Sequence, residues 1–239
     1  YLEIRMKKSP FFVFFECLAI CLGTFVLAAC SDNSASAEEF NAASICPESG
    51  RGSFVDDRAG KTYQYTTIGG QVWMAENLNY VVNGENLKNP LNGDIETASD
   101  KCFYPDDDCE VKGRAYKWLT AYNVCPDGWH LPSEHEWREL FKIVGGTDVA
   151  AYKLKSVSGW NSIDVDVDAR GEDLCGFGLL PSKSSATQSD GYVSSLWTST
   201  LRSDGLAAYF VSVQSHSIEA DIQEGAFFYL YVRCKKNLD

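Results

Sequence analysis

The clearest pattern of apolar and polar positions lies between Ser133 and Gly146. Four apolar residues there stand at i, i+3, i+4 and i+7 and so share one helix face: Trp137, Leu140, Phe141 and Val144. Ser133 and Glu136 have the spacing of a capping box, in which each side chain accepts a hydrogen bond from the other residue's amide. The pattern predicts a helix that starts after Ser133 and ends at the glycine pair 145–146.

Runs rich in β-branched and aromatic residues predict strands on both sides of this helix. Residues 62–68 and 71–74 are separated by Gly69-Gly70, which indicates a hairpin, and later runs cover 193–200, 207–213 and 227–234.

Two more helices are expected in the middle of the chain. One begins at Gly113 and places Ala115, Trp118, Leu119 and Tyr122 on one face, and a short one covers 149–154. Residues 84–100 and 159–190 have the composition of long loops. The element order predicts an α+β fold in which two main helices pack on small antiparallel sheets with long loops.

The first 29 residues have the pattern of an export signal. Lys7-Lys8, just after an expected natural start at Met6, precede a mostly apolar run over 11–27. The following Leu27-Ala28-Ala29-Cys30 resembles the lipobox of bacterial lipoproteins, which implies cleavage before Cys30 and attachment of lipid to it. A transmembrane anchor is the alternative, but the run is short for a span of about 20 residues and contains Glu16.

The segment after Cys30 predicts where the protein is held. Ser31, where an Asp would favour the inner membrane in such lipoproteins, implies the outer membrane or cell surface. Residues 30–45 are almost all small or polar, which is typical of a flexible tether. One domain is expected over 46–239, with membrane contact only through the lipid on Cys30.

The charge balance narrows the class of partner. The chain has 33 acidic and 21 basic side chains, a formal net charge of −12. Such a surface repels the phosphates of nucleic acids and anionic lipids, so neither is an expected partner. No cofactor is indicated by any motif.

The cysteines predict a disulfide-bonded exported domain. Of nine, Cys17 and Cys21 lie in the signal segment and Cys30 is the lipid site. An even number remains, which implies disulfides with fifteen formal pairings: Cys46, Cys102, Cys109, Cys125, Cys175 and Cys234. Cys102 and Cys109 enclose a short acidic loop and are expected to pair with each other. Zinc is disfavoured, because there is no Cys-x-x-Cys pair and the three histidines are poorly spaced.

Several ordered segments carry a family resemblance. One is Cys125-Pro126-Asp127-Gly128-Trp129-His130-Leu131-Pro132-Ser133-Glu134-His135-Glu136-Trp137, and another is Gly69-Gly70-Gln71-Val72-Trp73-Met74-Ala75-Glu76-Asn77-Leu78-Asn79-Tyr80. The others are 113–118, 154–160, 176–181, 196–200 and 232–234. Together, over about 54–236, they resemble the Fibrobacter succinogenes major paralogous domain, which is similar to the C-type-lectin-like superfamily.

The resemblance implies a C-type-lectin-like domain on an exported, often surface-held protein. It also implies a disulfide between Cys125, near the first helix, and Cys234 in the last strand, which leaves Cys46 for Cys175 by elimination. The calcium loop of sugar-binding lectins is missing, because Trp197-Thr198-Ser199-Thr200 has no carboxylate where those lectins have one. The family has no established activity to carry over.

Two sets of residues are candidate sites. Aromatic residues in the loop-and-strand half could bind a polysaccharide or another surface protein: Trp160, Tyr192, Trp197 and Tyr209. Asp164, Asp166 and Asp168 match the first positions of a calcium loop, but Ala169 and Cys175 stand at positions six and twelve, which excludes an EF-hand. Their alternation with valine favours a half-buried edge strand instead.

The sequence predicts a non-catalytic surface lipoprotein with a lectin-like binding or adhesion domain. No Ser-His-Asp or Cys-His set is indicated by spacing; His130 is expected to be a hydrogen-bonded packing residue and Trp129 a core residue. Two alternatives stay open. One is a divergent enzyme related to the formylglycine-generating enzymes, whose helix carries a similar Leu-Pro-x-x-x-Glu-Trp pattern, and the other is a structural envelope lipoprotein.

Overall fold

The computed structural model describes residues 40–238, except residues 83, 91, 104–105, 167, 184–189, 218–219 and 226–227. Contacts between residues divide the chain into Tyr1–Glu38 and Glu39–Asp239. The first unit lies outside the described residues, as do the expected signal peptide, Cys30 and most of the tether. Within the described part, no helix is both long and apolar enough to span a membrane.

One sheet is antiparallel throughout, with the strand order β1-β2-β3-β13-β8. The hairpin predicted at Gly69-Gly70 is confirmed: both glycines have positive φ (56° and 80°), as a tight two-residue turn requires. The short helices α1 (Ala42–Ile45) and η1 (Glu48–Gly50) precede this sheet. Its strands are β1 (Gly52–Asp56), β2 (Lys61–Ile68), β3 (Gln71–Met74), β8 (Trp129–His130) and β13 (Lys235–Lys236).

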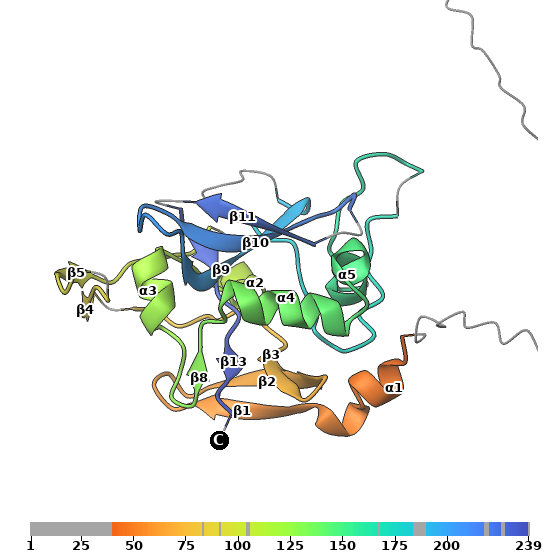
Figure 1. Cartoon of the computed structure of the whole chain (residues 1–239), viewed down its shortest axis with the longest axis horizontal. Helices are drawn as coiled ribbons and strands as arrows, with labels where there is room; N and C mark the ends of the chain where they lie inside the picture. Colours follow the sequence, from red (N-terminus) through yellow and green to blue (C-terminus); the bar gives the residue numbers. More distant parts are fainter. Residues whose placement is uncertain are drawn as a thin grey trace, which may run out of the picture. The chain divides into compact units, whose positions relative to one another are not determined.

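The other large sheet has the order β11-β10-β9-β12-β7-β6, and only β9 and β12 pair in parallel. Its strands are β6 (Asp100–Lys101), β7 (Ala115–Tyr116), β9 (Val193–Leu201), β10 (Ala208–Gln214), β11 (Ala220–Gly225) and β12 (Leu230–Tyr231). Figure 1 shows β9 to β11 at the top and the first sheet at the bottom. A separate hairpin of β4 (Asn86–Lys88) and β5 (Ile95–Thr97) projects at the left.

The helices are α2 (Asp106–Lys112), α3 (Trp118–Asn123), α4 (Glu134–Ile143) and α5 (Thr147–Leu154). The predicted capping box at the start of α4 is present in full. Its apolar stripe is confirmed as well, since the four predicted residues are at most 1% exposed. Trp137 packs against Trp73 of β3, with ring centroids 4.8 Å apart, which ties α4 to the first sheet.

The prediction that a helix begins at Gly113 is wrong for the first turn. Gly113 has φ 82°, and Ala115 and Tyr116 pair with β6 and β12, so the helix begins only at Trp118. The pairing strands are two residues long, so they leave no periodicity to be seen in the sequence.

Other differences concern short strands. The expected loop over 84–100 contains the β4–β5 hairpin and the first residue of β6, and β11 was not predicted. The single strand expected over 227–234 is wrong: β12 ends at Tyr231, and the chain then crosses to the first sheet. Along this crossing Val232 accepts a hydrogen bond from the amide of Leu78, and Cys234 accepts one from Met74.

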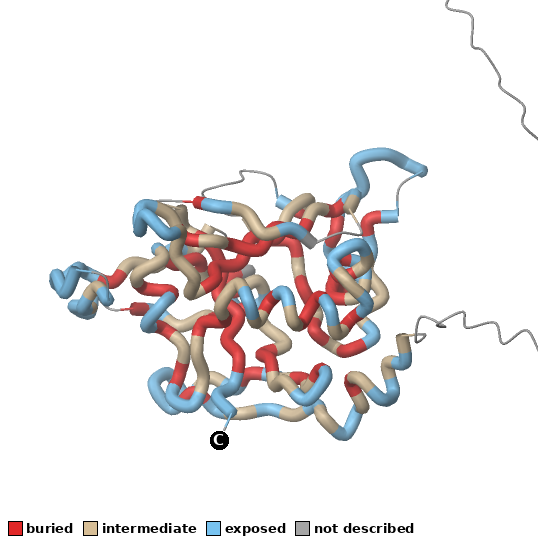
Figure 2. The backbone as a smooth tube through the Cα atoms, viewed as in Figure 1, coloured by how far each residue is buried: buried red, intermediate tan, exposed pale blue. Residues whose placement is uncertain are grey.

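The buried residues form two apolar clusters that α4 and the sheets enclose. In Figure 2 the buried segments run through the middle of the molecule, whereas the β4–β5 hairpin is exposed. Helices interspersed among largely antiparallel sheets confirm the α+β class.

Candidate functional site

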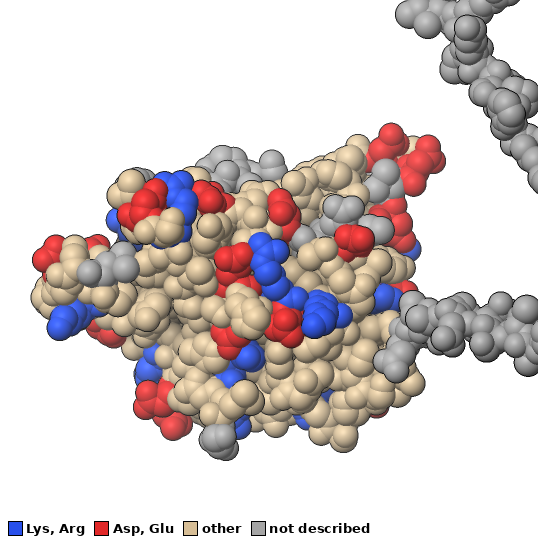
Figure 3. Space-filling view, viewed as in Figure 1, with Lys and Arg blue, Asp and Glu red and all other residues tan. Residues whose placement is uncertain are grey.

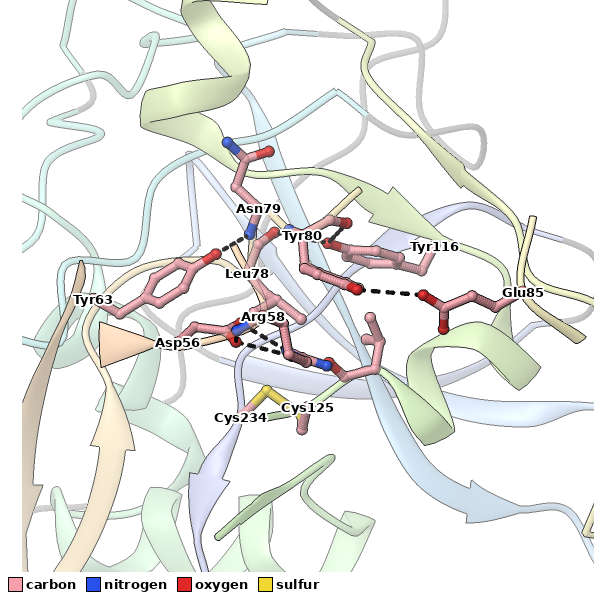
Figure 4. Close-up of polar contacts among 11 residues, drawn as sticks. Asp56, Arg58, Tyr63, Leu78, Asn79, Tyr80, Glu85, Tyr116, Cys125 and Cys234 are labelled. Carbon is pink, nitrogen blue, oxygen red and sulfur yellow. Dashed lines mark hydrogen bonds and ion pairs between the residues drawn. A yellow bond between two sulfur atoms is a disulfide. The ribbon is translucent and has the colours of Figure 1, made fainter. Parts of the chain in front are cut away.

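The segment Asn77–Tyr80 follows β3 and belongs to no strand. Two tyrosine hydroxyls hold its backbone: Tyr63 accepts from the amide of Asn79 (2.9 Å), and Tyr116 accepts from the amide of Tyr80 (2.8 Å). Tyr116 also donates to the carbonyl of Tyr80 at 2.8 Å (Figure 4). Both tyrosines are fully buried, and burial raises the pKa of each hydroxyl. The backbone position of Tyr80 is therefore held by hydroxyl groups that remain protonated near neutral pH.

The Tyr80 ring is further held by Arg58, whose guanidinium lies 4.2 Å from the ring centroid. Arg58 comes from the turn between β1 and β2 and is itself fixed by the buried Asp56 through Nε (2.8 Å) and Nη2 (2.7 Å). Its Nη1 donates to the carbonyl of Val124 at 2.9 Å. The Tyr80 hydroxyl donates to Glu85 (3.3 Å; Figure 4). These contacts orient the ring.

These residues border a cleft of about 580 Å³, here called the Tyr80 cleft. Its lining residues are Arg58, Ala59, Lys61, Asn79, Tyr80, Val81, Cys109, Glu110 and Arg114. The Glu110 carboxylate accepts hydrogen bonds from Lys61 Nζ (2.5 Å) and from the side-chain Nδ2 of Asn79 (2.9 Å). Arg114 is held through Nε by Asp100, and its two terminal nitrogens make no hydrogen bond within the described residues.

Two titratable groups of the cleft, Glu110 and Tyr80, have pKa values shifted away from neutral pH. The hydrogen bond from Lys61 lowers the pKa of Glu110 against the effect of its burial, so this carboxylate stays ionised. Burial and the neighbouring Glu85 raise the pKa of Tyr80, so its hydroxyl stays protonated. The cleft therefore presents fixed donors and acceptors around an aromatic ring.

A second hollow of about 590 Å³ lies beside α3 and the β4–β5 hairpin. It has an apolar side formed by Trp118, Leu119, Leu201 and Leu206, and polar residues of the hairpin, including Asn89 and Glu96, line it as well. Trp118 is fixed by its Nε1, which donates to the carbonyl of Thr198 at 2.9 Å.

The three disulfides are the pairs expected from the sequence: Cys46–Cys175, Cys102–Cys109 and Cys125–Cys234. Cys109 lines the Tyr80 cleft. Figure 4 shows the Cys125–Cys234 bridge near Asp56 and Arg58. The lipid site predicted at Cys30 lies outside the described residues.

The candidate aromatic residues do not form a common surface. Trp160 is 7% exposed and Trp197 1%, and their indole nitrogens donate to the carbonyls of Leu179 and Tyr116. Tyr192 and Tyr209 are half-buried, and of the four only Trp197 lines a described hollow. The prediction of surface binding by Trp160 and Trp197 is wrong, because both indoles are held inside the core.

The aspartates at 164, 166 and 168 do not form a metal site in the described structure. No group of three or more potential ligands lies together among the described residues. Asp168 instead pairs with Arg170 at 3.0 Å. The preferred edge strand is wrong too: residues 163–166 form bends and turns, and Val165 is 96% exposed, with no strand among the described residues paired to it.

The residues around the start of α4 have structural roles. His130 bonds to Glu136 (2.9 Å) and Asn237 (2.6 Å), which confirms the expectation of a hydrogen-bonded packing residue. Trp129 is half-buried in β8 and stacks on Phe54 at 4.3 Å, so the expectation of a core residue is only partly met.

Buried Arg233 links three of the sequence segments that carry the family resemblance. It is 1% exposed and donates to the Asn77 side-chain oxygen through Nε (3.2 Å) and Nη2 (2.9 Å). Its Nη1 donates to the carbonyl of Phe177, over whose ring the guanidinium lies. Asn77, Phe177 and Arg233 lie in three separate segments of the sequence. The Arg233 guanidinium contacts the other two residues next to segment 77–80, which contains Tyr80.

Sequence reasoning did not single out Tyr80, Arg58 or Arg114 as site residues. Asn79 and Tyr80 end one of the recognised segments, and Asp56 and Arg58 stand two apart in a turn, which is a weak signal for a bidentate pair.

Comparison with curated proteins finds no match, and comparison with solved structures finds none either. The sequence matches the Fibrobacter succinogenes major domain over residues 66–236. The match covers most of the chain and includes the displayed segment 77–80, Trp137 of α4 and Arg233. The chain belongs to the Fibrobacter succinogenes major domain family.

Proposed function

We propose that this protein is a non-catalytic carbohydrate-binding module and that the Tyr80 cleft holds the sugar. The observation that carries the proposal is an immobilised aromatic ring beside planar polar groups of Arg114, Asn79 and Glu110. Arg58 covers one face of the Tyr80 ring, so the proposal assigns the other face to the C–H face of a sugar ring, while the neighbouring donors and acceptors match the sugar hydroxyls. Because Tyr80 is already oriented, little conformational entropy is lost on binding.

The protonation states support binding rather than catalysis. A general acid or base works best with a pKa near the working pH, whereas the pKa of Glu110 is lowered and that of Tyr80 is raised. Burial does lower the pKa of Lys155 to about 8, but its amine is buried and donates to the carbonyls of Ser215 (3.0 Å) and Ser217 (3.1 Å). That lysine is engaged in holding a turn. These observations favour a binder over the divergent enzyme related to formylglycine-generating enzymes.

The proposal places the module at the cell surface. It takes the α+β domain as C-type-lectin-like, with Cys125–Cys234 as the bridge from the segment after α3 to the residue before β13, and takes Cys30 as its lipid anchor. Cys30→Ser should then abolish incorporation of labelled palmitate, since no other cysteine follows a lipobox. Persistent labelling of that variant would refute the lipid anchor and leave the cleft untouched.

A screen of the purified domain against plant, bacterial and algal polysaccharides should identify a ligand, and Tyr80 variants then locate it. Tyr80→Ala is expected to weaken binding at least about tenfold, equivalent to ~1.4 kcal/mol, because the stacking face is lost. Tyr80→Phe keeps the ring and should retain most of the affinity. The matched control is Tyr152→Ala, since Tyr152 is 37% exposed on α5 and outside the cleft. Full affinity in Tyr80→Ala would disprove this location of the site.

A further inference from the structure

A polar groove of about 620 Å³ lies between α4, the start of α5 and the strands β10 and β11. It shares no residue with the Tyr80 cleft. Figure 3 shows basic and acidic side chains intermixed in the middle of the face on which α4 is drawn. The lining residues are Arg138, Thr147, Ser212, Gln214, His216, Ser217, Asp221 and Ile222.

Ser212 is the first sign of a ligand in this groove. It lies in β10 opposite Ser195 of β9 and Asp221 of β11, and it is only 7% exposed. Its hydroxyl makes no hydrogen bond within the described residues, and its oxygen is not fully buried, so it is open to the groove. A ligand oxygen in the groove can therefore bond to it.

The start of α5 is the second sign. Its N-cap is Gly146, with φ 105°, so no side chain caps the helix. The first amides of a helix have no partner within the helix, and the helix dipole makes this end positive. Thr147, the first helical residue, lines the groove, so this end of α5 borders it. The Val149 amide already donates to the Gly146 carbonyl, and the first turn also carries Asp148, so the amides of residues 147 and 148 are the ones left for an anion.

Arg138 of α4 supplies a cation to the lining of the groove. Glu134 fixes it through Nε (2.8 Å) and Nη2 (2.7 Å), while Nη1 makes no hydrogen bond in the described part of the chain. The lining contains one carboxylate, Asp221, whose side chain accepts from Gln223 at 3.2 Å. Donors therefore come from α4, α5 and Ser212, and the carboxylate stands on β11.

We propose that this groove binds a tetrahedral oxyanion carried by a hydroxyl-bearing molecule, namely a sulfate or phosphate ester of a sugar. Arg138, the α5 amides and Ser212 bind the ester oxygens, because charge-assisted hydrogen bonds to an oxyanion are the strongest available there. Asp221 and the Gln214 amide bind hydroxyls of the sugar. This site is independent of the Tyr80 cleft and does not need the proposed function to be correct.

The test is calorimetric titration of the full domain with glucose 6-sulfate, glucose 6-phosphate, inorganic sulfate and glucose. The same titrations in Tyr80→Ala exclude binding at the other cleft. Both esters are expected to bind at least about tenfold more tightly than glucose, and inorganic sulfate to bind less tightly than the esters. Equal affinity for glucose and the esters, or no ester binding, would overturn the proposal. Inorganic sulfate as tight as the esters would overturn its sugar part.

Two variants locate the site. Ser212→Ala should weaken ester binding about fivefold to tenfold without lowering stability, because the hydroxyl has no hydrogen bond in the protein to lose. Arg138→Gln should weaken it at least about tenfold. The matched control is Arg170→Gln, since Arg170 is also an exposed arginine paired with a nearby carboxylate but lies outside the groove. Unchanged ester affinity in Ser212→Ala would place the ligand elsewhere.

Discussion

At the scale of single residues, the start of α4 depends on one carboxylate. Glu136 accepts from the Ser133 amide (2.8 Å), from Lys235 (2.7 Å) and from His130 (2.9 Å). Burial alone would raise the pKa of Glu136, but its bonds to His130, Lys235 and Ser133 lower it below the ordinary range. The capping box of one helix is thereby linked to β8 and β13 of the first sheet.

This network predicts a stability that depends on pH through His130. The hydrogen bond with Glu136 raises the pKa of His130, and burial opposes the shift. Because the pKa of His130 is higher in the folded than in the unfolded state, its protonation stabilises the fold. This stabilisation is fully present below the unfolded pKa of about 6.5 and is lost as pH rises through the folded pKa. The free energy of unfolding should therefore fall from about pH 6 to pH 8. Urea denaturation at four pH values measures this slope.

His130→Gln should remove the part of the slope that His130 contributes. The control is His135→Gln on the exposed side of α4, which should leave the slope as it is in the unmodified protein. An unchanged slope in His130→Gln would mean that another group causes the pH dependence.

At the scale of elements, sequence patterns were sufficient where one element carries its own signals. Helix α4 has a cap, an apolar stripe and a glycine stop, so its bounds could be predicted. Strand β7 is two residues long and exists because β6 and β12, distant in sequence, pair with it. No local pattern encodes such a pairing, which is why the helix expected from Gly113 began too early.

Ser133 and Trp129, which both precede α4, can be compared by substitution. Ser133→Ala should lower the free energy of unfolding by ~1 kcal/mol, because the cap is lost. Trp129→Ala should lower it by ~2 kcal/mol, less than the ~3–5 kcal/mol of a fully buried aromatic residue, because Trp129 is half-buried and stacks mainly on Phe54. Chemical denaturation of both variants gives the two values. A loss in Trp129→Ala smaller than that in Ser133→Ala would contradict the packing seen in β8.

At the scale of the whole molecule, the candidate site could not be predicted because several segments build it. The Tyr80 cleft combines the β1–β2 turn, the displayed segment 77–80, α2 and Arg114. Its geometry depends on Tyr63 and Tyr116, whose hydroxyls bond a backbone far away in sequence. Aromatic residues in strands looked like ligands, yet Trp160 and Trp197 are core residues. Only the three-dimensional arrangement distinguishes the two classes.

The Cys125–Cys234 bridge joins the segment between α3 and β8 to the residue before β13, across 109 residues. In the chain-entropy model, closing a loop of that length stabilises the folded state by roughly 4–5 kcal/mol. Cys125→Ser and Cys234→Ser should each remove most of this free energy, measured by chemical denaturation under non-reducing conditions. The double variant should be little less stable than either single variant, because the bond is already broken in both. Additive losses would show that the two sulfurs stabilise the domain separately, since only coupled residues give a non-additive cycle.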